Sequence, residues 1–305
     1  MKKHILLVLI LLLAACQPAQ RDDAGPHVLA STSFLADITQ NVAGDRLKVK
    51  SLLPVGIDPH AYQAAPADVM TIAESDLLIL NGFEYEHFIE PLLENAGGGH
   101  LIIEASDGLK ARQTDEHAEE TESDQGHAHE AVDPHMWMDP NLVITYAANI
   151  RDGLIQLDPA GADVYKANAD AYVAQLVELD SWIVVQVDQI PPERRLLVTS
   201  HEALGYFAER YGFEIVDTIL PSFSSEAGAS AQEIAAVVDA VRASGVTVIF
   251  LDEVENADLA DQIATETGVT IVNDLHLESL TDGPPADTYI EMMRHNVSRI
   301  VDALK

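Results

Sequence analysis

The sequence predicts an α/β protein with two lobes, each holding a parallel sheet flanked by helices, joined by a long, rigid α-helix. Short apolar runs of strand length alternate with amphipathic helical patterns, an order typical of βα units and parallel sheets. This order occurs twice, before and after one long helical stretch at residues 158–190. A chain of 305 residues also suits two domains of ordinary size better than one.

The first half of the chain, residues 27–157, is predicted to form the N-terminal lobe. Its apolar runs of strand length lie at residues 28–31, 47–53, 77–80 and 101–104. Helical patterns lie at residues 34–42, 66–74, 86–95 and 140–157. Because these strands and helices largely alternate, we expect the strands to run parallel within one sheet.

A long helix is predicted to begin near Pro159 and to continue to about Gln189, where two prolines follow. No glycine interrupts it after Gly161, and at about 1.5 Å per residue it would span more than ~40 Å. We therefore expect residues 158–190 to form a stiff connector and not a flexible hinge. Its apolar residues recur mostly at steps of three or four, at Tyr165, Ala169, Tyr172, Leu176, Leu179 and Ile183.

Residues 191–305 repeat the plan of the first half and are predicted to form the C-terminal lobe. Strand-like runs lie at residues 196–199, 214–219, 247–251 and 269–272. Helical patterns lie at residues 203–211, 231–243, 257–267 and 288–304. The two lobes should therefore resemble each other in architecture.

The chain is strongly acidic, with 17 basic and 50 acidic side chains and a formal net charge of −33. Binding to nucleic acid needs Lys and Arg to contact phosphates, so no nucleic-acid partner is expected. Such a surface favours encounter with cations at low salt. It equally suits a soluble protein of a salty or acidic habitat, so the charge alone identifies no ligand.

The N-terminus predicts an exported lipoprotein. Two lysines precede an apolar run at residues 5–15, too short to span a membrane and typical of a secretory signal. Residues 13–16, Leu-Ala-Ala-Cys, resemble a lipobox, so we expect lipidation of Cys16, a signal peptide at 1–15 and a tether at 16–26. Alternatively, Cys16 is a free cysteine after an ordinary signal. As the only cysteine, it excludes an internal disulfide.

An acidic, histidine-containing stretch at residues 110–130 interrupts the βα pattern. It carries His117, His127 and His129 among many carboxylates, and we expect a disordered surface loop there. It is either a solvated insertion without a role or a weak collector of metal ions.

Four side chains that can ligate a metal stand out: His60, His135, His201 and Asp274. His201 and Asp274 closely follow predicted strands, and His60 and His135 lie in proline-bounded loops. In open parallel α/β sheets, ligands collect at the carboxyl ends of the strands. Facing lobes would thus bring all four into one cleft, where three imidazoles and a carboxylate suit zinc.

Both His60 and His135 end an Asp-Pro-His tripeptide. The proline limits the freedom of each loop. Asp58 and Asp133 are candidates to bond the second ring nitrogen of the following histidine and to fix its tautomer.

His276 competes with Asp274 because it lies only two residues further along the chain. The fourth ligand is therefore Asp274, His276 or a water molecule, with Asp274 preferred. Glu202 is adjacent to His201, but a helical neighbour points about 100° away, so the two should not share an ion. The other histidines of the predicted lobes are interpreted as structural or surface residues, namely His27, His87, His100 and His295.

Four motifs resemble the metal-binding subunits of bacterial ABC importers, the zinc- and manganese-type solute-binding lipoproteins. They are Gly-Ile-Asp-Pro-His-Ala-Tyr at residues 56–62, Asp-Pro-His-Met-Trp-Met-Asp-Pro at 133–140, Ser-His-Glu-Ala at 200–203, and Asn-Asp at 273–274 with the segment 288–297. The resemblance covers nearly all of the chain after the signal. Leu-His-Leu at residues 275–277 departs from the expected pattern and puts the fourth ligand in question.

The resemblance implies a bilobed receptor that captures Zn²⁺ between its lobes and delivers it to an ABC permease, without catalysis. Manganese-type members usually carry Glu where this chain has His201, and zinc-type members commonly carry a His-rich acidic loop, so zinc is preferred and Mn²⁺ stays possible. The alternatives are a manganese- or iron-type receptor and a secreted zinc hydrolase. We expect a monomer, held at the membrane outside the cytoplasm by a lipid on Cys16.

Overall fold

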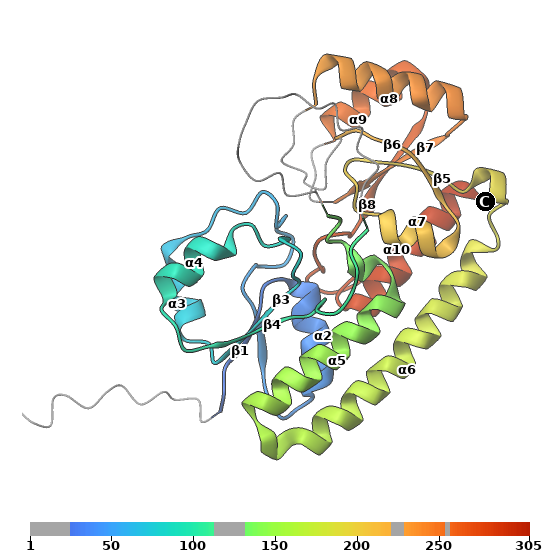
Figure 1. Cartoon of the computed structure of the whole chain (residues 1–305). Coiled ribbons are helices and arrows are strands. Elements are labelled where there is room, and N and C mark those ends of the chain that lie inside the picture. The colour runs from blue at the N-terminus through green and yellow to red at the C-terminus, as the bar shows by residue number, and fades with distance from the viewer. Residues whose placement is uncertain (1–24, 113–131, 221–228, 254–256) are drawn as a thin grey trace, which may run out of the picture.

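The computed structural model describes residues 25–112, 132–220, 229–253 and 257–305. Within them the chain forms two four-stranded parallel sheets, one in each lobe, and a long helix runs along both lobes (Figure 1). The expected signal peptide, Cys16, most of the tether and most of the His-rich loop lie outside the described residues. No described helix is both long and apolar enough to span a membrane.

The N-terminal lobe has the strand order β2-β1-β3-β4. Parallel pairing sets Val28 beside Leu77 and Leu77 beside Leu101. Helices α3 and α4 cover one face of this sheet, and α2 and α5 cover the other (Figure 1). The strands are β1 (Val28–Ala30), β2 (Val49–Ser51), β3 (Leu77–Leu80) and β4 (Leu101–Glu104), and the helices are α2 (Ser33–Ala43), α3 (Pro66–Ala73), α4 (Ile89–Ala96) and α5 (Pro140–Leu157).

The linking helix α6 spans Ala162–Val187 and follows a short 3-10 turn at Pro159–Gly161. It packs against α2 and α5 of the first lobe and against the C-terminal helix α10 (Tyr289–Leu304) of the second. Its buried side chains lie at the spacing expected of an amphipathic helix, and they include Tyr165, Ala169, Tyr172, Leu176, Leu179 and Ile183.

The C-terminal lobe repeats the topology with the order β6-β5-β7-β8, so β8 is an edge strand. Helices α8 and α9 cover its outer face, while α7 and α10 lie on the side of α6 (Figure 1). The strands are β5 (Leu196–Thr199), β6 (Glu214–Thr218), β7 (Val248–Asp252) and β8 (Thr270–Leu275), and the remaining helices are α7 (Gly205–Tyr211), α8 (Ala231–Ser244) and α9 (Asp258–Thr267).

Alternating side chains divide each sheet between two apolar cores. In β1 and β3, Val28 and Leu77 face the inner core, whereas Leu29 and Leu78 face the helices α3 and α4. The inner core continues without a break into the C-terminal lobe through α6, α7 and α10. The lobes are therefore packed together on one shared core, and the predicted two-lobe α/β fold is confirmed.

A partly buried acid, Asp37, also joins the lobes. The Asp37 carboxylate on α2 accepts a hydrogen bond from the backbone N–H of Tyr289, the first residue of α10, at 3.0 Å. Burial raises the pKa of Asp37 to about 6, although this hydrogen bond favours the charged form. The carboxylate is thus ionised near neutral pH at a cost to stability.

This pKa predicts that acid stabilises the fold through Asp37. Between about pH 6 and pH 4 the folded chain takes up a proton that the unfolded chain does not yet bind, so the free energy of unfolding rises as the pH falls. Relative to Asp37→Asn, the unaltered metal-free protein should gain about 2 kcal/mol of stability between pH 7.5 and pH 4.5. Urea denaturation at both pH values measures this gain, and an unchanged stability difference between the two proteins would refute it.

Candidate metal centre

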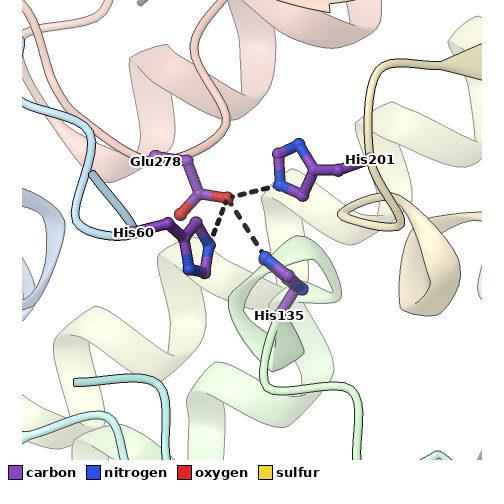
Figure 2. A group of neighbouring side chains, drawn as sticks. All are labelled: His60, His135, His201 and Glu278. Atoms are coloured by element: carbon purple, nitrogen blue, oxygen red, sulfur yellow. Dashed lines mark hydrogen bonds and ion pairs between the residues drawn. The ribbon is translucent and has the colours of Figure 1, made fainter. Parts of the chain in front are cut away.

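Three histidines from three loops converge between the lobes (Figure 2). His60 lies in the loop after β2, His135 immediately precedes a 3-10 turn at Met136–Met138, and His201 follows β5. Their ring centroids are 5.4 to 5.7 Å apart. All three side chains are at most 2% exposed. The structure thus brings together the three histidines that the sequence selected.

Glu278 completes the cluster, and its carboxylate lies at the centre of the three rings (Figure 2). Its Oε1 atom is 3.1 Å from Nε2 of His135, 3.2 Å from Nε2 of His201 and 3.7 Å from Nε2 of His60. Ligand atoms around a tetrahedral zinc ion, with bonds of about 2.0–2.1 Å, stand roughly 3.3 Å apart. A small cation fits among these four donors after little adjustment.

The sequence predicted Asp274 as the carboxylate of this cluster, but the structure places Glu278 there. Asp274 lies within β8, its Oδ1 atom accepts a hydrogen bond from Arg299 Nε at 2.8 Å, and its side chain is 43% exposed. The strand continues to Leu275, so the turn into the site begins three residues later than predicted. His276, the rival candidate, also lies outside the cluster, and its Nδ1 atom is 2.9 Å from Glu253.

The sequence around Glu278 contains a signal for a buried acid. Leu275, Leu277 and Leu280 around it are buried, so a single acid stands in an apolar segment just beyond a strand end. An ionised carboxylate is seldom buried unless it is paired or binds a metal. Glu278 has a side-chain exposure of only 1%.

The backbone and both oxygens of Glu278 are fixed by neighbours. Asp252, at the end of β7, accepts hydrogen bonds from the backbone N–H groups of Leu277 and Glu278. From the N-terminal lobe, the indole of Trp137 donates to the Leu277 carbonyl at 2.8 Å. The Tyr85 hydroxyl donates to Oε2 of Glu278 at 2.6 Å. Only Oε1 is therefore directed at the histidines.

A strained turn positions Tyr85. Phe83 and Glu84 adopt positive φ angles of 53° and 58°, which are uncommon for residues other than glycine. The buried Glu86 carboxylate stabilises this turn by accepting hydrogen bonds from the Asn81 backbone and from the Ser31 hydroxyl. Strain of this kind persists where the surroundings enforce it, often at functional sites.

Asp133 orients His135 as the sequence predicted. Its Oδ1 atom is 3.0 Å from Nδ1 of His135, which leaves Nε2 for the cluster. Arg112 donates to the other oxygen of Asp133 and to Glu209 on α7, which ties the pair to the C-terminal lobe. Gly205 leaves room for this contact, because a Cβ atom there would lie 1.7 Å from the Arg112 guanidinium.

His60 and His201 are held differently. Asp58 accepts a hydrogen bond from the backbone N–H of His60 at 2.8 Å. Both ring nitrogens of His60 are buried without a hydrogen-bond partner among the described residues. The Ser200 hydroxyl lies 3.3 Å from Nδ1 of His201. Buried polar atoms without partners are costly, and a cation ligated by Nε2 of His60 would satisfy one of them.

Charge in the cluster is balanced internally. Burial opposes ionisation of Glu278, yet the neighbouring histidines, His135 first, keep its pKa well below the usual range. Burial likewise opposes a charge on His135, but Glu278 and Asp133 raise its pKa above the ordinary value. Burial and the Glu278 carboxylate raise the pKa of Tyr85, so its hydroxyl remains a donor. Glu278 is thus an anion, the form that ligates a metal.

Comparison with known proteins identifies the family. The family model described as "Zinc-uptake complex component A periplasmic" matches residues 28–303.

The chain belongs to this family.

It is similar to the manganese-binding lipoprotein MntA of Halalkalibacterium halodurans, with 33% identity over 305 residues that cover 98% of this chain and 97% of the relative. The Mn-bound periplasmic metal binding protein of Candidatus Liberibacter asiaticus has a TM-score of 0.79 at 30% identity and covers 92% of this chain and 100% of its own. The periplasmic zinc binding protein TroA of Treponema pallidum has a TM-score of 0.82 at 26% identity and covers 92% and 99%.

This protein is therefore a metal-binding substrate receptor of an ABC importer and not an enzyme, as the sequence predicted. Members of the family act together with the permease of an ABC transporter, which agrees with the predicted partner. They lie outside the cytoplasm at the membrane, which agrees with the predicted location. The names of its relatives include both manganese and zinc, so the family alone does not decide the metal.

The contact between Asp133 and His135 predicts a measurable effect on metal affinity. Asp133→Asn should weaken metal binding about 10- to 100-fold, because the amide does not enforce the tautomer that leaves Nε2 free. Glu209→Gln alters the exposed partner of the same Arg112 and should leave affinity within about 2-fold. Zinc titration against a chromogenic chelator compares the two. Equal affinities in the two variants would show that Asp133 does not act through His135.

Proposed function

We propose that this receptor captures Zn²⁺ with His60, His135, His201 and Glu278 and delivers it to its permease. The observation that supports this most is the donor set, three imidazole nitrogens and one carboxylate oxygen, all buried and converging on one point. Four such donors match the closed tetrahedral coordination that zinc prefers. Because zinc is the cargo here, no position needs to stay open for a reacting water.

Manganese fits this set less well. Imidazole ligands shift preference towards zinc, whereas Mn²⁺ is best served by carboxylate, carbonyl and water oxygens in octahedral geometry. The hydrogen bond from Tyr85 uses one lone pair of Oε2 of Glu278 and holds this oxygen towards Tyr85, so the carboxylate presents Oε1 to the histidines. The cluster therefore supplies a single oxygen donor.

A manganese- or iron-type receptor is the second candidate, and the names of relatives favour it. MntA is called manganese-binding, and the iron-binding protein YfeA of Yersinia pestis is 30% identical over 276 residues. If Oε2 of Glu278 were released from Tyr85, the carboxylate would become bidentate and coordination would rise to five. Whether Tyr85 holds Oε2 of Glu278 therefore distinguishes a zinc receptor from a manganese- or iron-type receptor.

The sequence supports the remaining parts of the proposal. We infer a lipid on Cys16, because the lipobox-like residues 13–16 follow an apolar signal. A lipid there would hold the receptor near the permease. The acidic stretch with His117, His127 and His129 would collect ions weakly, and a monomer suffices because one chain supplies the four donors.

The proposed metal preference predicts the outcome of a competition experiment. Zinc should bind on the order of 100-fold or more tighter than manganese, in the direction of the general order of stability for nitrogen ligands. Metal-free protein is titrated with zinc in the presence of increasing Mn²⁺. Tyr85→Phe should strengthen manganese binding and thereby lower the ratio of zinc affinity to manganese affinity. Manganese affinity equal to or above that of zinc in the unaltered protein would overturn the zinc assignment.

The identity of the fourth ligand predicts a contrast between two acids four residues apart. Glu278→Gln should weaken zinc binding by at least about 10-fold, since even partners of metal ligands have effects of that size. Asp274→Asn should leave the affinity nearly unchanged, because Asp274 pairs with Arg299 outside the cluster. Calorimetric titration of both variants checks this. If Asp274→Asn lost more zinc affinity than Glu278→Gln, Asp274 of β8 and not Glu278 would be the fourth ligand.

A further inference from the structure

A cavity of about 380 Å³ lies between the lobes beside the metal centre. Gly56 of the N-terminal lobe lines it opposite residues of the C-terminal lobe, including Asp252 and Ser279. The backbone N–H of Gly56 donates to the Ser279 hydroxyl at 2.8 Å, so the lobes touch along its wall. Asp252 also bonds the Glu278 backbone. The cavity therefore adjoins the cluster without containing any of its four ligands.

His276 and Glu253 form a pair in this cavity. Nδ1 of His276 lies 2.9 Å from Oε2 of Glu253, close to the 3.1 Å that separates His135 and Glu278 in the metal centre. The His276 side chain is only 7% exposed, whereas that of Glu253 is 56% exposed and can turn towards an ion. Asn296 fixes the His276 backbone by bonding both its N–H and its carbonyl.

The charges around the pair favour a cation. Asp252, Glu253 and Asp282 line the cavity, and none of its described lining residues is Lys or Arg. The ring of His295 lies 5.0 Å from that of His276, but its Nε2 atom is engaged with the Asp274 carbonyl. One imidazole and one carboxylate form a pair of donors that divalent transition metals accept, and the other carboxylates add negative charge around it.

We propose that His276 and Glu253 form a second, weaker site for divalent transition-metal ions, where the cargo ion is held next to the buried centre. This inference rests on the proposed receptor function. Only the main cluster gathers three or more ligand groups within the described residues, so the second site has two protein ligands and completes its coordination with water. Two ligands bind weakly, which suits an ion that must move on to Glu278, two residues further along the chain.

A simple ion pair between His276 and Glu253 is the competing explanation, and a binding count separates the two. Equilibrium dialysis with zinc is performed on the full mature chain and on His276→Gln, Glu253→Gln and the control His100→Gln. The first two variants should each lose one weakly bound zinc and keep the tightly bound one. His100→Gln, which alters a histidine outside this cavity, should lose neither. Equal numbers of weakly bound ions in all four proteins would refute the second site.

A paramagnetic probe locates the ion. Protein with one equivalent of zinc is titrated with Co²⁺, and histidine ring signals are followed by NMR, with those of His276 assigned from His276→Gln. The His276 signals should shift or broaden at several-fold lower Co²⁺ than those of His100, and Glu253→Gln should remove the difference. Parallel responses of the two rings would contradict the proposal.

The two proposals fail in different ways. If the unaltered chain binds no zinc tightly, the proposed function fails whatever the variants show. If tight zinc is present but the His276 signals respond no earlier than those of His100, only the second site is lost.

Discussion

The metal centre depends on a fixed relation between the two lobes, because its donors come from both and must meet within a few ångströms. One shared apolar core supplies that relation. Trp137 lies fully buried within it, stacks on Phe34 at 4.5 Å, donates to the Leu277 carbonyl and accepts a hydrogen bond from Tyr289. Its contacts thus join both lobes one residue from Glu278. The continuous helix α6 packs on the same core, so large rotations of the lobes would expose apolar surface at high cost.

Within this frame, one carboxylate links the two lobes chemically. Oε1 of Glu278 faces three imidazoles and Oε2 accepts the Tyr85 hydroxyl, so this C-terminal side chain is satisfied almost entirely by N-terminal residues and His201. A buried carboxylate without such partners would be strongly destabilising. The same contacts that stabilise the charge also restrict its geometry, and they direct a single oxygen towards the ion.

The sequence predicted the fold well because its signals were local. Pro140–Leu157 and Leu196–Thr199 have the predicted boundaries, since Asp139 caps α5 and β5 is an apolar run between polar residues. The carboxylate that completes the cluster, Glu278, was not predicted because β8 is an edge strand, where exposed Thr270 and Asn273 are tolerated. These polar residues resembled the end of a strand, so the site residue was expected several positions before Glu278 in the sequence. Tyr85 and Asp252 act through tertiary contacts, which periodicity does not report.

The fold is shared by relatives named for manganese, iron and zinc, so it does not select the ion. Selection must lie in the few side chains that touch the ion and in those that restrict them. In the proposed site, His201 would supply nitrogen from the C-terminal lobe, and Tyr85 would restrict Glu278 to one oxygen. Both features lower the number of oxygen donors, and they act from opposite lobes. A change towards manganese would therefore require more than one substitution, because restoring a second carboxylate oxygen would still leave three imidazoles around the ion.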